Sequence, residues 1–117
     1  MIDEILRNGL TSVLLRIPLY DSESASGAGK TGLDYTTSGL VISTIADNEA
    51  SATVYKSSDS SLETISTIGT YATPTSGKAR FKAVDATNHP GLYELQLPDA
   101  RFAVSNAKSL LITITCS

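Results

Sequence analysis

The pattern of hydrophobic and polar residues along the chain predicts a series of short β-strands. Apolar residues recur with a period of two, or β-branched residues cluster, and turn-forming residues separate one such segment from the next. The expected strands are residues 14–19, 40–45, 52–56, 62–71, 78–84, 91–97 and 109–116. Seven or eight strands at this spacing are typical of an all-β antiparallel sandwich or barrel.

Two of these segments also indicate their place in a sheet. Residues 40–45 are apolar on both faces, which favours a central strand. Residues 14–19 contain Pro18, which has no backbone N–H to donate, so this strand lies at a sheet edge or ends there.

One short helical turn is expected near residues 99–104. Asp99 is a good N-cap residue, and Ala100 and Arg101 favour helix. Phe102 would then dock against one end of the sandwich.

The N-terminal residues 1–11 precede the first expected strand. Ile2, Ile5 and Leu6 fall at helical spacing before a stop at residues 8–9, so we expect a helical turn or a loose arm. Residues 12–117 then form a single β-sandwich domain.

A tyrosine near the end of the chain narrows the fold class. In immunoglobulin-like sandwiches, a tyrosine near the start of the penultimate strand bonds through its hydroxyl to backbone a few residues upstream. Tyr93 follows Pro90 and Gly91, which favour a tight turn at residues 88–91. We therefore predict an immunoglobulin-like antiparallel β-sandwich whose structural corner is formed by Pro90, Gly91 and Tyr93.

Composition agrees with a β fold and restricts the partners. The 117 residues include 16 Ser and 14 Thr, whereas only 18% are charged. The net charge of −3 argues against binding to nucleic acid or an anionic membrane, because both require a basic surface. The acidic start at residues 1–4 differs from a secretory signal, so we expect a protein made and retained in a cytoplasm.

The sequence contains few residues of the types that catalytic sites use. His89 and Cys116 are the only histidine and cysteine, so one chain cannot assemble a His-based metal cluster or an internal disulfide. Residues 26–31 resemble the end of a phosphate-binding loop, but position 24 is serine where the motif needs glycine. We expect no enzyme activity, cofactor or metal; a calcium site would have to use four scattered carboxylates, those of Asp47, Glu49, Asp59 and Glu63.

Residues 28–116, most of the chain, resemble a known group of proteins. Residues 81–103 read F-K-A-V-D-A-T-N-H-P-G-L-Y-E-L-Q-L-P-D-A-R-F-A. This run is similar to a block in small accessory proteins of tailed bacteriophages, as are G-K-T-G-L at residues 29–33 and S-G-L at residues 38–40. The resemblance implies a virion-exterior β-sandwich that is made in the host cytoplasm and serves as a capsid decoration (cement) protein or as a tail or baseplate accessory.

The resemblance also implies partners. These are phage capsid or tail proteins and other copies of the chain, which would form a trimer if it decorates a head. Ile2, Ile5 and Leu6 are the expected apolar anchors of a docking arm, and residues 21–32 are a second candidate.

Two other functions stay open at this point. One is a carbohydrate- or receptor-binding module of a tail or cell surface. Without tryptophan, its sugar-stacking residues would be Tyr20, Tyr35, Tyr55 and Tyr71. The other is an immunoglobulin-like domain of a larger bacterial protein.

Overall fold

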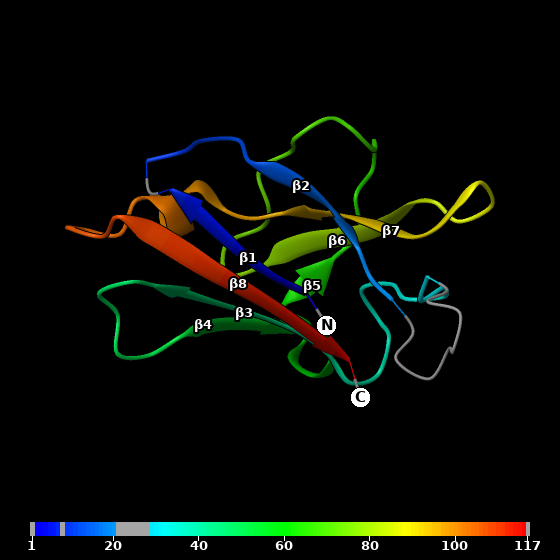
Figure 1. Ribbon diagram of the computed structural model, residues 1–117, viewed down its shortest axis with the longest axis horizontal. Helices are drawn as coiled ribbons and strands as arrows, with labels where there is room; N and C mark the ends of the chain where they lie inside the picture. The colour runs from blue at the N-terminus through cyan, green and yellow to red at the C-terminus, as the bar shows by residue number, and fades with distance from the viewer. Residues whose placement is uncertain (1, 8, 21–28, 117) are drawn as a thin grey trace.

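The protein is a sandwich of two four-stranded β-sheets (Figure 1). The computed structural model describes residues 2–7, 9–20 and 29–116, with residues 2–5 described by their backbone. Sheet A has the order β1-β8-β3-β4, with β1 Ile2–Arg7, β8 Ser109–Cys116, β3 Leu40–Ala46 and β4 Thr53–Lys56. Sheet B has the order β2-β7-β6-β5, with β2 Leu14–Pro18, β7 His89–Gln96, β6 Ala79–Asp85 and β5 Leu62–Glu63.

The all-β sandwich predicted from the sequence is confirmed. Neighbouring strands are antiparallel except β5 and β6, which are parallel. The immunoglobulin-like assignment stays a prediction. Two 3-10 turns, η1 Ser57–Asp59 and η2 Asp99–Phe102, are the helical elements described, and no helix in the described ranges is long and apolar enough to cross a membrane.

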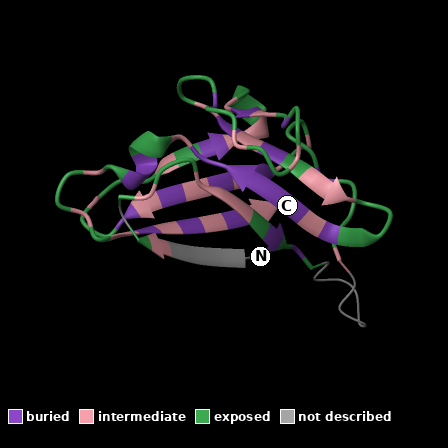
Figure 2. Cartoon of the chain, turned by 90° about the horizontal axis from the view of Figure 1, so that it is seen from above, coloured by how far each residue is buried: buried purple, intermediate pink, exposed green. Residues whose placement is uncertain are grey.

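The core lies between the two sheets. Residues of β3 and β8 alternate between buried and intermediate, and this alternation is visible along the strands in Figure 2. Ile42 and Ile112 are fully buried from sheet A, and Phe81 and Tyr93 come from sheet B. The rings of Phe81 and Tyr93 stack with their centroids 5.0 Å apart. The period-two pattern of the sequence therefore reflects one face packed against the opposite sheet.

Several positional predictions are confirmed. Strand β2 ends at Pro18 and occupies the edge of sheet B, and β3 is a central strand. The helical turn lies at η2, and Phe102 is fully buried. Asp99, however, does not cap this turn: its N-cap is Pro98, without a side-chain bond, and the Asp99 carboxylate accepts the N–H of Ser12 at 2.7 Å.

The N-terminal segment differs from the helical turn or loose arm expected for residues 1–11. Residues Ile2–Arg7 form strand β1, which pairs antiparallel with β8 from Ile2↔Ile114 to Arg7↔Ser109. The edge of β8 presents backbone donors and acceptors that need partners, and this pairing satisfies them. Leu6 packs against the core, whereas the side chains of Ile2 and Ile5 lie outside the described part of the structure.

A second difference concerns the strand expected at residues 62–71. Only Leu62–Glu63 pairs, as β5, and residues 64–78 run as a loop rather than as a strand. Side chains of β7 take the backbone hydrogen bonds of this loop, as the geometry below shows.

Removing residues 1–7 tests whether β1 is part of the fold. We expect the free energy of unfolding to fall by about 2 kcal/mol or more, because a partly buried leucine and a whole strand pairing are lost. Urea denaturation of the truncated chain measures this loss. Arg7→Ala, which alters an exposed side chain of the same strand, is the control and should change stability little. A truncated chain as stable as the intact one would mean that residues 1–7 behave as a loose arm.

Candidate functional site

Tyr93 holds together two segments that are far apart in the sequence. Its buried hydroxyl donates to the carbonyl oxygen of Lys30 at 2.6 Å and accepts the N–H of Leu33 at 3.3 Å. Burial raises the pKa of Tyr93, so the phenol stays neutral and can both donate and accept. The hydroxyl of Tyr93 therefore does not bond to backbone a few residues upstream, as the predicted corner requires, but joins β7 to residues 30–33, an arrangement called the Tyr93 clasp below.

Two glycines allow this clasp to close. The backbones of Gly29 and Gly91 touch: a Cβ on Gly29 would collide with the carbonyl oxygen of Pro90, and a Cβ on Gly91 would lie 2.6 Å from the Gly29 Cα. Gly91 also has a φ of +90°, which side chains disfavour. Leu19 connects both sides, because its N–H donates to Gly91 at 2.7 Å and its carbonyl accepts the N–H of Lys30 at 2.8 Å.

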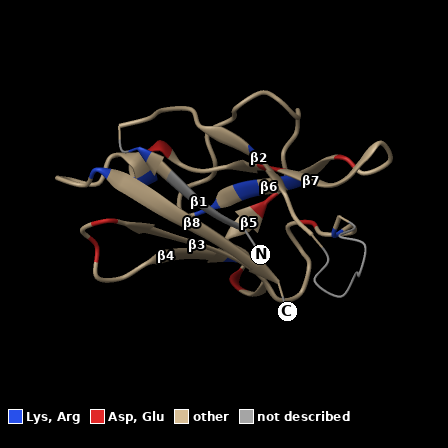
Figure 3. Cartoon of the chain, in the orientation of Figure 1, with Lys and Arg blue, Asp and Glu red and all other residues tan. Residues whose placement is uncertain are grey.

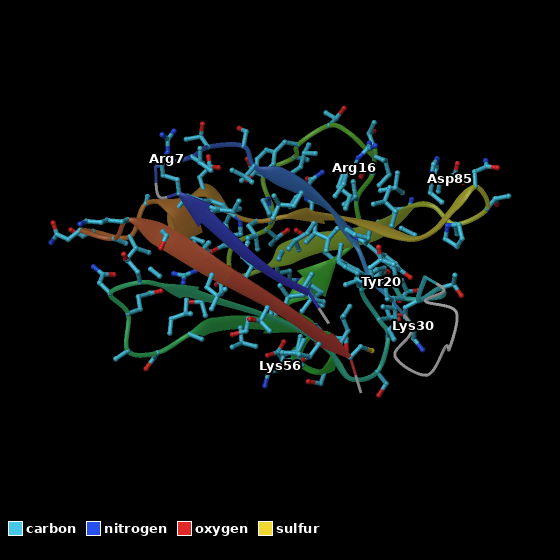
Figure 4. The ribbon with its side chains drawn as sticks, viewed as in Figure 1. Arg7, Arg16, Tyr20, Lys30, Lys56 and Asp85 are labelled. Carbon is cyan, nitrogen blue, oxygen red and sulfur yellow. The ribbon has the colours of Figure 1, made fainter. Side chains whose placement is uncertain are left out.

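The turn predicted at residues 88–91 is wrong: the observed turn starts two residues earlier and ends three residues earlier. The β6–β7 hairpin turns at residues 86–88, and the pair Asp85↔His89 closes it. The Asp85 carboxylate accepts the N–H groups of Thr87 at 3.2 Å and Asn88 at 3.1 Å, and the bonds from Asn88 lower the pKa of Asp85. Asp85, labelled near the hairpin tip in Figure 4, thus places the turn before Pro90 and Gly91.

Asp85 and His89 are the closing pair of this hairpin. One carboxylate oxygen of Asp85 is occupied by two backbone N–H groups, and the other accepts the side-chain amide of Asn88 at 3.1 Å. His89 is exposed at the first position of β7. Asp85 therefore organises the hairpin turn.

A buried guanidinium fastens η2 to sheet A. Arg101 donates to the Thr44 hydroxyl at 2.9 Å and forms a two-pronged ion pair with the Glu49 carboxylate, at 2.6 and 3.3 Å. Glu49 also accepts the N–H of Ala46 at 2.7 Å, and the hydrogen bond from Arg101 is the main cause that lowers the pKa of Glu49. The sequence pattern predicts Arg101 only as a helix former and gives no local signal for this buried ion pair.

A second buried charge lies on the outward side of sheet B. The side chain of Glu94 is fully buried. Its carboxylate accepts the N–H of Gly69 at 3.1 Å, the side-chain amide of Gln96 at 3.0 Å and the Arg16 guanidinium at 3.3 Å. These donors compensate the cost of removing the carboxylate from water.

Gln96, two residues further along β7, also binds the backbone of the loop of residues 64–78. Its side-chain oxygen accepts the N–H of Ala72 at 3.0 Å, and its amide donates to the carbonyl of Thr70 at 3.1 Å. Glu94 and Gln96 thus bind the loop of residues 64–78 over the outer face of sheet B. This explains why the β-branched residues after β5 form no further strand.

The carboxylates considered for calcium have separate protein partners. Within the described ranges, no three His, Cys, Asp or Glu side chains gather as a metal site would require. Asp47 accepts the N–H of Lys108, Asp59 binds Ser61, and Glu63 binds Thr75, while Glu49 pairs with Arg101 as described above.

The four tyrosines considered for sugar stacking divide into two groups. Tyr55 is buried, and the Tyr71 hydroxyl donates to the carbonyl of Leu97 at 2.8 Å. Tyr20 is 58% exposed and Tyr35 is 39% exposed.

Tyr35 also lines a surface hollow of about 250 Å³. Its other lining residues are Thr36, Ser57, Ser60, Leu62, Glu63 and Lys78. Small-molecule sites typically measure about 300 to 1,000 Å³, so this hollow is small for a ligand site.

The chain matches no protein-family model, no curated protein sequence and no solved structure. The phage resemblance therefore rests on its motifs, and the structure shows what these do locally. Residues 29–33 and residues 81–103 meet at Tyr93, and the second block also contains the Asp85 turn and the Arg101 anchor. Both motifs thus have a structural role in this fold.

Replacing the clasp hydroxyl tests its contribution. We expect Tyr93→Phe to lower the free energy of unfolding by about 1 to 3 kcal/mol, because the Lys30 carbonyl and the Leu33 N–H lose their partner. Amide hydrogen exchange at Leu33 should accelerate at the same time. Tyr20→Phe is the matched control at an exposed ring. Equal stability of the two variants would contradict the assignment.

The Arg101–Glu49 pair should make stability depend on pH. Because the folded-state pKa of Glu49 lies below the ordinary value of 4.5, the pair stabilises the fold above that pH and loses its effect as pH falls through the lowered pKa. The difference in unfolding free energy between wild type and Glu49→Gln should therefore be largest near neutrality and shrink below pH 4.5. Urea titrations at stepped pH measure this difference. In an Arg101→Met background the pH-dependent difference should be much smaller, and its full persistence there would contradict the pairing.

Proposed function

We propose that this chain is a non-enzymatic structural protein of a tailed phage particle, either an exterior capsid decoration or a tail or baseplate accessory. The observation that carries the proposal is that the buried polar side chains hold loop and turn segments against the sheets. Among the described residues these are Thr44, Glu94, Gln96 and Arg101. Each takes part in hydrogen bonds that fasten a loop or turn to a sheet.

Such an arrangement suits a building protein better than an enzyme. A catalytic site needs polar groups held ready for a substrate in a cleft. Among the described residues, the interior polar groups hold residues 64–78 and η2 against the sheets, so these two segments present a defined surface. A subunit that must dock repeatedly on a shell or tail benefits from such a surface, because little ordering entropy is lost on binding.

The resemblance to phage accessory proteins supports the same proposal. Two of the three segments that carry it, residues 29–33 and residues 81–103, are distant in sequence and are joined by the Tyr93 hydroxyl. The proposed location is the virion, after synthesis in the host cytoplasm, and the proposed partners are capsid or tail proteins and further copies of the chain. The docking role proposed for Ile2 and Ile5 stays a proposal, now as part of an edge strand, whereas Leu6 packs against the core and is withdrawn from it.

The alternative of a carbohydrate- or receptor-binding module has less support. Tyr55 and Tyr71 are unavailable for stacking on a sugar. Tyr20 and Tyr35 are exposed, and the hollow beside Tyr35 is small. We therefore favour the structural role.

The proposed role predicts that the chain is part of purified particles. Particles from a lysate of the host that carries the encoding phage genome are banded on a density gradient and digested for mass spectrometry. We expect peptides of this chain to band with the capsid and tail proteins at a constant copy number per particle. A soluble host protein of similar size, removed by the same gradient, is the control. Recovery of the chain only from the soluble fraction would refute the proposed role.

A further inference from the structure

The free edge of β1 differs from the other three sheet edges. Strands β1 and β4 form the edges of sheet A, and β2 and β5 form those of sheet B. Proteins commonly protect an exposed edge by keeping its strand short or by placing proline in it. Strand β5 has two residues, β4 has four, and β2 ends at Pro18. Strand β1 has six residues and no proline, so it is the longest of the four edge strands and lacks both of these protections.

The register of sheet A shows which backbone groups of β1 point away from the sheet. The carbonyl of Ser109 accepts the N–H of Asp47 at 3.1 Å, so the odd-numbered residues of β8 bond toward β3. The even-numbered residues of β8 therefore bond toward β1, where they face even-numbered residues. The N–H and C=O groups of Asp3, Ile5 and Arg7 thus point to the free edge, where no strand of the described ranges pairs with them.

The charged residues of β1 have no counter-charge in register on the neighbouring strand. Asp3 stands opposite Thr113 of β8, and Arg7 stands opposite Ser109. Strands β3 and β8 contain no Lys, Arg, Asp or Glu and are drawn without blue or red in Figure 3. A partner strand at the free edge can therefore supply the opposite charges that sheet A itself does not.

We propose that the free edge of β1 pairs antiparallel with the same edge of a second copy of this chain. The two copies form a two-fold dimer in which both A sheets join into one continuous sheet. A two-fold axis at Ile5 places Asp3 of each copy opposite Arg7 of the other. Opposite charges at directly opposed positions stabilise antiparallel strands. Because the contact is isologous, both Asp3–Arg7 pairs form together.

The charges of β1 select this register from the neighbouring ones. With Ile5 on the axis, the outward backbone groups of Asp3, Ile5 and Arg7 oppose one another and can form about six hydrogen bonds, two for each opposed pair. An axis at Glu4 would place two carboxylates directly opposite each other, which is destabilising. An axis at Leu6 would leave Asp3 beyond the end of the opposing strand. A second copy in the Ile5 register therefore matches the edge in both backbone groups and charge.

The size of the contact predicts a reversible dimer. Pairing through one strand edge gives a small interface, and small interfaces are weak. Sedimentation equilibrium of the purified chain, without an added N-terminal tag, should therefore show a monomer–dimer equilibrium between about 1 μM and about 1 mM.

Amide hydrogen exchange tests the edge residue by residue in the wild-type chain. As the concentration rises, the N–H groups of Ile5 and Arg7 should become protected, because they gain partners in the second copy. The N–H groups of Glu4 and Leu6 face β8 in the monomer and are the internal control. Slowing that is absent from Ile5 and Arg7 would contradict the pairing.

Charge reversal tests the register. Arg7→Asp and Asp3→Arg should each raise the dimer dissociation constant about tenfold, since each turns two opposite-charge pairs into two like-charge pairs. The double variant restores opposite charges in exchanged positions and should associate like the wild type. Lys56→Asp makes the same change of charge on β4, the opposite edge of sheet A, and should leave association unchanged. Circular dichroism and thermal midpoints verify that each variant folds.

A wild-type chain that stays monomeric over the whole range overturns the proposal. So do folded single variants that associate like Lys56→Asp, and a folded double variant that does not recover. If a variant does not fold, the exchange measurement on the wild type decides. The inference assigns a contact to the self-association named in the proposed function. Its failure leaves the virion experiment untouched, because self-association in solution and incorporation into particles are measured separately.

Discussion

The close contact between the backbones of Gly29 and Gly91 is the constraint on which much of this structure depends. A side chain at either position would collide with backbone of the other segment. Only with both side chains absent can Leu19 bond to the two segments at once. The Tyr93 hydroxyl then reaches the backbone of residues 30–33. These contacts together position three segments: the end of β2, the start of β7 and the chain leading toward β3.

Buried polar side chains hold the loop of residues 64–78 and η2 against the sheets. Main-chain hydrogen bonds hold strands to strands, whereas Glu94 and Gln96 hold a loop to sheet B and Arg101 holds η2 to sheet A. Removing any of these side chains would leave buried donors or acceptors unpaired, which costs more than the bond itself contributes. The loop of residues 64–78 and η2 are thus held against the sheets by buried hydrogen bonds.

The sequence predicts most strands because a period of two is a local signal, and β8 begins and ends where the alternation indicates. It could not predict features that depend on distant partners. Strand β1 forms because the edge of β8 is available for pairing. Arg101 is buried because it pairs with Glu49, which lies 52 positions earlier in the sequence and gives no local signal. At the hairpin, Pro90 and Gly91 predict a turn at residues 88–91. The Asp85 carboxylate instead accepts the N–H of Asn88, so the chain turns at residues 86–88. Residues 64–71 are rich in β-branched side chains whether they pair with a strand or with Glu94, so composition alone cannot distinguish the two outcomes.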